Sequence, residues 1–342
     1  MTSSPAAPGA DPRPGAPTVL YILSAGRSGS TLLERMLGGL PGFTNVGELV
    51  GLLRRVVPPD QRCGCGRPFS ACPFWQSVGQ RAFGGWEPER VERPISLQRR
   101  VSRQRNLLTL TLPRLAGSAR REELSAYGEL LRQLYAAIRD ETGAKVIVDA
   151  SKWPKQALVM RQVDGIDLRV LHLVRDVRGV TYSWSKTDVP RLTRIGEGQL
   201  FPTNSPGKTA AWWSVLETEA AWLNAVTSRS TTIRYEDLVS DARGTLGGAL
   251  AALDLGWAAD KLDHVQGNVV ALGPSHGVSG NPSRFKTGDV TLRADDAWRT
   301  SLSRRDAMLV SALGLPALIG HGYLRRSRQL SGSGRRQFGA QA

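Results

Sequence analysis

The stretch Thr18 to Leu37, TVLYILSAGRSGSTLLERML, decides the fold of this chain. Its first part, Thr18 to Leu23, is a short run of β-branched and apolar residues, which is typical of a buried parallel strand. Leu32 to Leu37 places apolar residues at helical spacing, and Gly38 and Gly39 end the predicted helix. The turn SAGRSGST therefore joins a buried strand directly to a helix.

This turn has the composition of an anion site. Gly26 and Gly29 let the backbone approach an oxyanion closely, and the start of the helix supplies free N–H groups with a positive dipole end. Arg27 adds a guanidinium suited to phosphate, while Ser30 and Thr31 can cap the helix or donate to the same anion. The alternative is an ordinary strand-to-helix turn with a Ser or Thr cap.

The turn differs from the loop of nucleotide triphosphatases, GxxxxGK[ST], in which a lysine reaches the terminal phosphates and a hydroxyl holds Mg²⁺. Aligned on Gly29, this chain has Ser24 in place of the first glycine and Ser30 in place of the lysine. Its cation comes earlier, at Arg27. The sequence thus indicates a site for an anion rather than for a metal-bridged triphosphate.

Further strands and helices alternate along the rest of the chain. Strands are predicted at Lys145 to Asp149, Leu168 to Val174 and Thr231 to Tyr235, and helices at 107–139, 176–187, 209–228, 237–254 and 301–313. Residues 58–94, 188–208 and 273–297 are predicted to be irregular. The alternation favours an α/β fold: a parallel sheet with helices on both faces, and a helical insertion after the first strand–helix unit.

Composition sets the broad class. The chain has 342 residues, of which 41% are hydrophobic and 22% charged, as in globular domains. We expect a disordered segment over 1–17, one domain over 18–320 and a basic flexible tail over 321–342. No apolar run reaches the roughly 18–20 residues of a membrane helix, and no secretory signal is visible. A cytoplasmic location is therefore expected.

The chain is strongly basic, with 45 Lys and Arg against 30 Asp and Glu and a formal net charge of +15. Such a surplus favours anionic partners, either nucleic acid, a membrane surface or a phosphorylated small molecule. The basic clusters lack interleaved aromatic residues, so we expect no nucleic-acid partner. A nucleic-acid-binding protein remains the alternative, and it would bind DNA or RNA with steep salt dependence.

A second basic site follows the third predicted strand, in LVRDVRGVTYS. Ligands of open α/β sheets bind beyond the carboxyl ends of the strands, so Arg175 should emerge at the same edge as the glycine turn. Ser183 lies eight residues further on and converges on the same anion only if the chain bends back. In the alternative interpretation Arg175 pairs with Asp176 and Ser183 is merely polar. Two anion sites on one edge predict a ligand with two separated charged groups.

Together these motifs resemble the sulfotransferases that use 3′-phosphoadenosine 5′-phosphosulfate (PAPS), in particular their bacterial and carbohydrate-directed branch. The similarity lies in GRSGSTLL after a strand and LVRDVRGVTYS after a later one. It extends to YEDL, GNPSRF, CGCG and CPFW, which begin at Tyr235, Gly280, Cys63 and Cys72. The resemblance covers most of residues 18–300 in order. It implies a P-loop-like fold that works without a metal, so we expect no metal cofactor.

Carried over by position, the resemblance implies a role for each motif residue. Gly26, Arg27, Ser28, Gly29, Ser30 and Thr31 would hold the 5′-phosphosulfate, Arg175 and Ser183 the 3′-phosphate, while Arg284 and Lys286 would close over the nucleotide. The acceptor would be a hydroxyl of a sugar, a glycolipid or a small metabolite.

Sulfuryl transfer to an alcohol needs a base for the hydroxyl proton. We expect Glu48 to be this base, because relatives have a carboxylate in that segment; the alternative is an exposed glutamate. Lys152 falls where cytosolic members have a histidine, and it would either stabilise the transferring sulfonate or pair with Asp149. His276 is a reserve candidate for the base, whereas His172 is expected to be a core residue.

The three cysteines, Cys63, Cys65 and Cys72, supply three thiolates. No histidine precedes His172, so a fourth zinc ligand would have to come from far along the chain. We therefore expect reduced cysteines or one disulfide rather than a zinc site. Trp212, Trp213, Leu216 and Leu223 form an apolar stripe that is expected to pack in the core; lining of an acceptor pocket is the alternative.

A P-loop kinase or NTPase is the competing enzyme class. In that interpretation KVIVD is a Walker-B-like strand whose last residue, Asp149, serves Mg·ATP. Ser30 at the lysine position weakens this hypothesis. A PAPS-dependent sulfotransferase is the function that the sequence favours.

Overall fold

The computed structural model describes residues 15–57, 60–187 and 202–324. The predictions made for residues 1–14, 188–201 and 325–342 lie outside the described residues. The strands are β1 (Thr18–Ser24), β2 (Phe43–Gly47), β3 (Val146–Lys152), β4 (Asp167–Val174), β5 (Ser230–Arg234), β6 (Val265–Gln266), β7 (Val269–Leu272) and β8 (Gly288–Thr291).

Helices occupy most of the chain between these strands. They are α1 (Ser30–Gly38), α2 (Pro73–Phe83), α3 (Pro88–Val101), α4 (Leu107–Thr111), α5 (Ser118–Thr142), α6 (Pro154–Met160), α7 (Val177–Ser185), α8 (Pro206–Val226), α9 (Tyr235–Ser240), α10 (Ala242–Ala252), α11 (Trp298–Ser301), α12 (Arg304–Leu313) and α13 (Leu315–Gly320).

The main sheet has five parallel strands in the order β2-β3-β1-β4-β5. The strand of the glycine turn lies at its centre, and Thr18 at its start pairs with Val146 on one side and Asp167 on the other. All carboxyl ends therefore meet at one edge, where an open α/β sheet binds its ligands. The predicted α/β class and the four predicted strands are confirmed.

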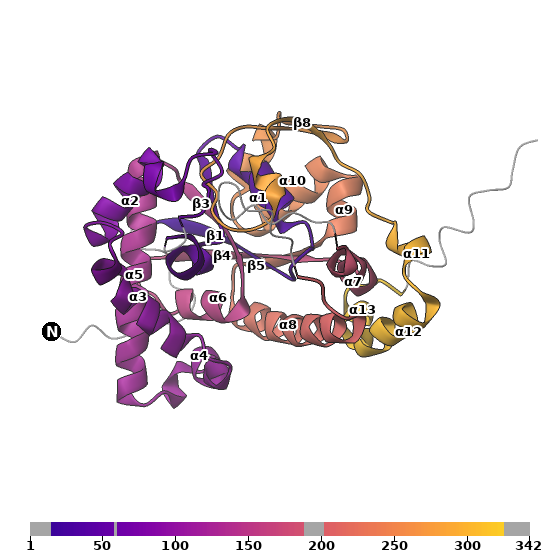
Figure 1. Ribbon diagram of the computed structural model, residues 1–342, viewed down its shortest axis with the longest axis horizontal. Coiled ribbons are helices and arrows are strands. Elements are labelled where there is room, and N and C mark those ends of the chain that lie inside the picture. Colours follow the sequence, from indigo (N-terminus) through magenta and orange to yellow (C-terminus); the bar gives the residue numbers. More distant parts are fainter. Residues whose placement is uncertain (1–14, 58–59, 188–201, 325–342) are drawn as a thin grey trace, which may run out of the picture.

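Helices cover both faces of this sheet, because β1 is apolar on both sides. Val19, Tyr21 and Leu23 pack into one core with the helices of the 73–160 region, whereas Leu20 and Ile22 pack into a second core with α1 and α10. Alternate side chains of a strand point to opposite faces, so one apolar run fills both layers. Figure 1 shows the resulting layers, with α1 and α10 above the sheet, α6 and α8 below it and α5 to its left.

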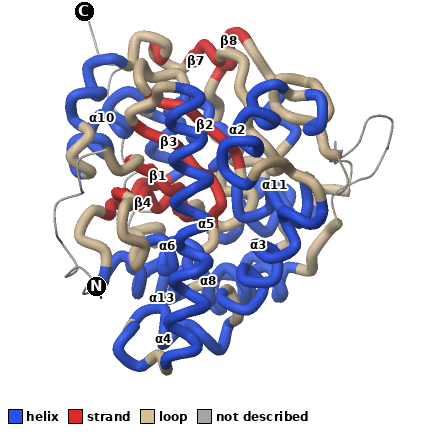
Figure 2. The backbone as a smooth tube through the Cα atoms, turned by 90° about the vertical axis from the view of Figure 1, so that its left-hand side faces the viewer, coloured by secondary structure: helices blue, strands red, loops and turns tan. Residues whose placement is uncertain are grey.

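The insertion between α1 and β3 differs from the prediction in two ways. Residues 43–47 form the edge strand β2, so the helical insertion follows a second strand rather than the first strand–helix unit. Residues 58–94 are not irregular throughout, because α2 and α3 begin within them, each with a proline in its first turn. Proline is favoured there, since its missing N–H is not needed. In Figure 2 α5 of this insertion runs across the sheet.

The segment 265–291 forms a small antiparallel sheet, β6-β7-β8, above the main one. The predicted loop 273–297 is thus interrupted by β8 and by a short 3₁₀ helix, Pro282–Phe285. This loop returns to the main sheet, where Val278 pairs with Gly47 at the end of β2. Among the helices of the described residues, none has the length and apolar character required to span a bilayer.

Candidate functional site

A cavity of about 600 Å³ lies at the carboxyl edge of the main sheet. Most of the residues singled out in the sequence line it: Gly26, Arg27, Gly29, Ser30, Thr31, Glu48, Lys152, Arg175, Ser183 and Arg284. Two do not. Ser28 is fully buried, and Lys286 lies outside the lining.

The glycine turn is shaped by two aromatic rings. Gly29 has φ +91°, and a Cβ on it would stand 2.6 Å from the ring of Tyr235, so only glycine fits. A Cβ on Gly26 would stand 3.0 Å from Trp184. The helix α1 begins directly after Gly29, which leaves the first-turn amides of α1 available to an anion at the cavity.

Arg27 lies in the middle of this turn with φ +69°, a left-handed conformation that is uncommon for a residue with a side chain. Its guanidinium carbon stands 5.4 Å from the centroid of the Trp184 ring. Burial lowers the pKa of this guanidinium from its ordinary value. The hydroxyl groups of Ser24 and Ser28 have no hydrogen-bond partner within the described residues. The turn thus combines a cation with polar groups suited to an anion.

Arg175 leaves the end of β4 toward the same turn, as predicted. Its Nη1 donates to the carbonyl oxygen of Arg27 at 2.9 Å, and its Nη2 donates to Oδ2 of Asp295 at 3.0 Å. The guanidinium carbon also stands 4.5 Å from the centroid of the Tyr235 ring. The alternative in which Arg175 pairs with Asp176 is wrong: the described partner of the Asp176 carboxylate is Arg178.

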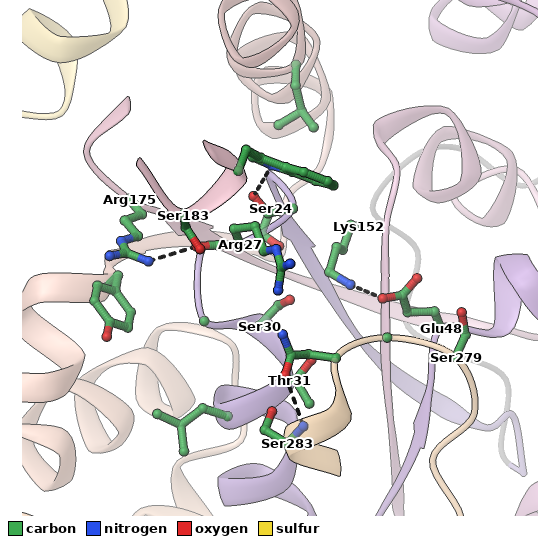
Figure 3. A pocket seen from close by; sticks show the side chains of 18 of the residues that line it. Ser24, Arg27, Ser30, Thr31, Glu48, Lys152, Arg175, Ser183, Ser279 and Ser283 are labelled. Carbon is green, nitrogen blue, oxygen red and sulfur yellow. Dashed lines mark hydrogen bonds and ion pairs between the residues drawn. The ribbon is translucent and has the colours of Figure 1, made fainter. Parts of the chain in front are cut away.

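Ser183 reaches the cavity from α7. Asp176 caps this helix, which begins at Val177, directly after Arg175. The chain therefore turns at the start of α7, and this turn brings Ser183 back toward the same anion site as Arg175. Figure 3 shows Arg175 and Ser183 on one side of the cavity, the Lys152–Glu48 pair on the other, and Arg27 between them. Arg175, Arg27 and Lys152 therefore all face the same cavity.

The carboxylate of Glu48 forms an ion pair with Nζ of Lys152 at the far side of the cavity. Lys152 has φ +72°, so the end of β3 is strained where the lysine enters the site. The alternative pair of Lys152 with Asp149 is not formed. Asp149 is buried and accepts from Tyr135 Oη at 2.6 Å, and burial raises the pKa of this carboxyl to about 6. The kinase hypothesis requires Asp149 to reach the ligand as a Walker-B acid, but Asp149 does not line the cavity.

Glu48 is positioned by contacts between distant parts of the chain. Its backbone N–H donates to the carbonyl of Val278 at 2.9 Å. The preceding residue, Gly47, has φ +80°, and a Cβ on it would overlap the Val278 backbone. Glu34 Oε1 accepts from Gly47 N at 2.7 Å, and burial raises the pKa of Glu34 to about 7 even though a hydrogen bond from Asn45 opposes this. The candidate base thus rests on α1 and on the 273–285 loop together.

The 273–285 loop forms another wall of the cavity. Arg284 is buried, donates to the Gly280 carbonyl at 3.2 Å, and has its pKa lowered to about 10 by burial. Nη2 of Arg35, on α1, donates to the carbonyl of Gly273 at the start of the loop at 2.5 Å. A Cβ on Gly280 would lie 3.2 Å from Glu48 Oε1 and 3.6 Å from Thr31 Oγ1. The loop therefore brings the carboxylate close to the start of α1.

The histidines lie away from the reacting edge. His172 is buried in β4, and its Nε2 lies 3.3 Å from Glu217 Oε2, which His321 also contacts at 2.9 Å; the expectation of a core residue is confirmed. His276 does not line the cavity but lies beside the cysteines, so it is wrong as a reserve base.

Several aromatic and polar lining residues were not predicted. Trp153, Trp184, Asn204 and Lys208 line the cavity without having been assigned a role. The apolar stripe of α8 was expected to pack in the core, with lining of a pocket as the alternative, and each holds for part of it. Trp213 and Leu223 are buried in cores, whereas Trp212 and Leu216 line the cavity. The faces of α8 could not be assigned from the sequence because this helix is apolar on more than one side.

Comparison with known proteins places the chain in a family. The sulfotransferase family model matches residues 19–259, well over half of the chain. No curated protein matches the sequence.

Solved structures of low identity resemble the chain. The sulfotransferase domain from the curacin biosynthetic pathway is 17% identical, with 87% of this chain and 97% of that chain covered and a TM-score of 0.45. The sulfotransferase domain of the Synechococcus PCC 7002 olefin synthase is 20% identical, with 88% and 96% covered and a TM-score of 0.41. Retinol dehydratase in a complex with retinol and PAP is 14% identical, with 89% and 82% covered and a TM-score of 0.37. The assignment rests on the family model: the chain belongs to the sulfotransferase family.

Proposed function

We propose that this protein transfers a sulfuryl group from PAPS to a hydroxyl of a sugar, a glycolipid or a small metabolite. The observation that carries the proposal is the contact of Arg175 with the Arg27 carbonyl, which joins two basic sites into one cavity. A doubly anionic adenosine compound has its phosphates at both ends of the ribose. A cavity that presents Arg27 and Arg175 as two separate cations matches such a ligand.

In this proposal the glycine turn binds the 5′-phosphosulfate. Gly29 permits the close approach of the backbone, the first-turn amides of α1 donate to the anion, and Arg27 neutralises it. Arg175 and Ser183 bind the 3′-phosphate. Asp295 now accepts from Arg175, so a bound phosphate would compete with this carboxylate for the guanidinium.

The chemical step needs an acceptor oxygen in line with the bond to the leaving phosphate. The acceptor O–S bond forms, the S–O bond to the 5′-phosphate breaks, and the hydroxyl proton passes to Glu48. Arg27 and the α1 amides stabilise the charge that grows on the leaving phosphate. Lys152, held at the Glu48 carboxylate, contacts the transferring sulfuryl oxygens.

Part of the cavity lining is aromatic or aliphatic and could receive the acceptor. Trp153, Trp212 and Leu216 belong to this part, and 42% of the Trp153 residue surface is exposed. Indole rings bind the apolar face of a ring or a lipid chain well. This composition supports an acceptor that combines a hydroxyl with an extended apolar face.

Calorimetric titration of the full chain tests the donor. We expect adenosine 3′,5′-bisphosphate to bind with micromolar affinity in the presence of EDTA, and Mg·ATP to bind far more weakly. Tight binding of Mg·ATP together with no binding of the bisphosphate would overturn the proposal in favour of the kinase class.

Turnover then tests the reaction. Incubation with PAPS labelled in the sulfuryl group should transfer label to one or more alcohols of a panel that includes glycolipids and aromatic alcohols. Release of the bisphosphate should accompany the transfer in equal amount. Bisphosphate release with no labelled product from any alcohol would show hydrolysis instead of transfer.

A further inference from the structure

Four potential metal ligands meet outside the cavity. They are Cys63, Cys65 and Cys72, from the segment before α2, and His276, from the 273–285 loop. Their ligand atoms all lie within 4.8 Å of one another. The three cysteines are free, and two of them, Cys63 and Cys72, are buried. The proposed sulfuryl transfer uses none of these side chains.

Four of the six separations between these atoms are close to the edges of one coordination tetrahedron. Zinc bonds of about 2.3 Å to sulfur and about 2.0 Å to nitrogen require ligand separations of about 3.8 Å between sulfurs and about 3.5 Å between sulfur and nitrogen. Cys72 Sγ lies 3.6 Å from Cys63 Sγ and 3.8 Å from Cys65 Sγ. Nδ1 of His276 lies 3.3 Å from Cys72 Sγ and 3.6 Å from Cys63 Sγ. A disulfide needs about 2.05 Å between sulfurs, far less than these distances.

Neighbouring groups contact three of the four ligands, Cys63, Cys72 and His276. The backbone N–H of Cys65 donates to Cys63 Sγ, and that of Trp75 donates to Cys72 Sγ. The His276 ring stacks on Phe74 with 4.7 Å between centroids, and its carbonyl accepts from Trp75 Nε1 at 2.9 Å. Such outer contacts orient metal ligands and support thiolate charge.

We propose that Cys63, Cys65, Cys72 and His276 bind one Zn²⁺ ion. Four protein ligands complete a tetrahedron and leave no position for water or substrate, so the site is structural. Sequence alone favours reduced cysteines or one disulfide over this ion, because the fourth ligand lies more than 200 positions after Cys72. The fold supplies the histidine that the local sequence lacks.

The ion would fasten the 273–285 loop to the start of α2. The same junction already has the Gly64 N–H donating to the Gly277 carbonyl at 2.9 Å. Four residues beyond His276, Gly280 enters the cavity beside Glu48, and Arg284 follows. Because Val278 pairs with β2 at Gly47, the metal site would stabilise the wall that positions Glu48.

Metal content of the purified full chain, grown with zinc in the medium, tests the proposal first. We expect one zinc per chain by elemental analysis, and loss of most of it in His276→Ala. His264→Ala is the matched control, since His264 contacts only the Met36 carbonyl among its described polar partners. It should keep the zinc. A folded His276→Ala protein that retains zinc with wild-type stoichiometry would overturn the proposal.

Cobalt spectroscopy of the wild-type chain keeps the proposal testable if the variants do not fold. After removal of zinc under reducing conditions, addition of Co²⁺ alone should give sulfur-to-cobalt charge-transfer absorption and the intense visible bands of a tetrahedral ion. Subsequent zinc should abolish them at one equivalent. Absence of zinc in the wild type together with absence of the cobalt bands would refute the site, and so would iron–sulfur absorption of the isolated protein.

These measurements need no substrate. Zinc binding and sulfuryl transfer can therefore fail separately. A chain that binds neither zinc nor cobalt but transfers label refutes only the metal site, and a zinc-loaded chain that does not use PAPS refutes only the proposed reaction.

Discussion

The glycine turn and the Glu48 wall of the cavity are built in opposite ways. In the turn, residues 24–31 are contiguous, and one strand and one helix fix their positions. The Glu48 wall is assembled from the end of β2, the 273–285 loop and α1, which meet through Val278, Gly47 and Glu34.

This difference separates anion binding from proton transfer in the proposed reaction. The part of the donor site that binds the 5′-phosphosulfate depends on a local backbone shape, whereas the base depends on contacts that span most of the chain. Variants in one region should therefore change affinity for the nucleotide, and variants in the other should change turnover.

Glu48→Gln should have the largest effect. Removing a general base typically lowers turnover by about 10²–10⁴-fold, and we expect a loss in that range with calorimetric affinity for adenosine 3′,5′-bisphosphate unchanged. Glu122→Gln, at an exposed glutamate, is the control and should match the wild type. A fully active Glu48→Gln protein would assign the base to another residue and remove the division between the two regions.

Glu34 links the two regions and predicts a dependence of stability on pH. Its folded-state pKa is raised to about 7, mainly by burial, so between about pH 4.5 and 7 the folded state holds a proton that the unfolded state has lost. The free energy of unfolding should fall as pH rises through this range. The unfolding equilibrium constant should rise by about a hundredfold over the same range. Chemical denaturation of Glu34→Gln should show a smaller fall, since glutamine stays neutral and its oxygen still accepts from Gly47. Equal slopes in both proteins would contradict the assignment.

Arg175→Ala tests the nucleotide side. Loss of a charge-assisted contact to phosphate should weaken adenosine 3′,5′-bisphosphate by about tenfold or more and spare adenosine 5′-phosphosulfate, which lacks the 3′-phosphate. Arg178→Ala is the matched control, because Arg178 also lies over an aromatic ring but does not line the cavity. If both variants weaken the bisphosphate equally, Arg175 has no specific role.

Asp295→Asn should have the smallest effect, and in the opposite direction. The Asp295 carboxylate occupies Arg175, and a neutral amide would compete less with a phosphate. We expect the bisphosphate to bind a few-fold more tightly, with a larger dependence on salt concentration, because the site carries one negative charge less. Weaker binding in calorimetry would mean that Asp295 orients Arg175 for the phosphate instead of competing with it.

The parts of the fold that could be predicted are those whose signal is local. β1, β3 and β4 are rich in β-branched and other apolar residues, as is typical of buried parallel strands. The strand β2, FTNVG, carries too few apolar residues to be recognised, and it forms because β3 and Val278 pair with it. The helices α2 and α3 begin at prolines in a region rich in turn residues, which the pattern assigned to irregular structure.

The same distinction holds for the cavity. Arg27 and Arg175 follow strands whose ends must share an edge, so their convergence could be predicted from topology alone. The partner of Lys152 could not, because the sequence offers Asp149 three residues away, whereas Glu48 reaches the lysine only through the pairing of β2 with β3. His276 reaches the cysteines through the return of the 273–285 loop, which leaves no periodic signal.

Arg27 and Lys152 both adopt left-handed backbone conformations, with φ +69° and +72°. Each conformation costs about 1 kcal/mol or more for a residue with a side chain, and a glycine would relieve it. Selection for heat resistance alone would therefore favour glycine at both positions. The cavity would then lose the positive charges of Arg27 and Lys152. In the proposed reaction, thermal tolerance and turnover would thus be set against each other at the backbone of two residues.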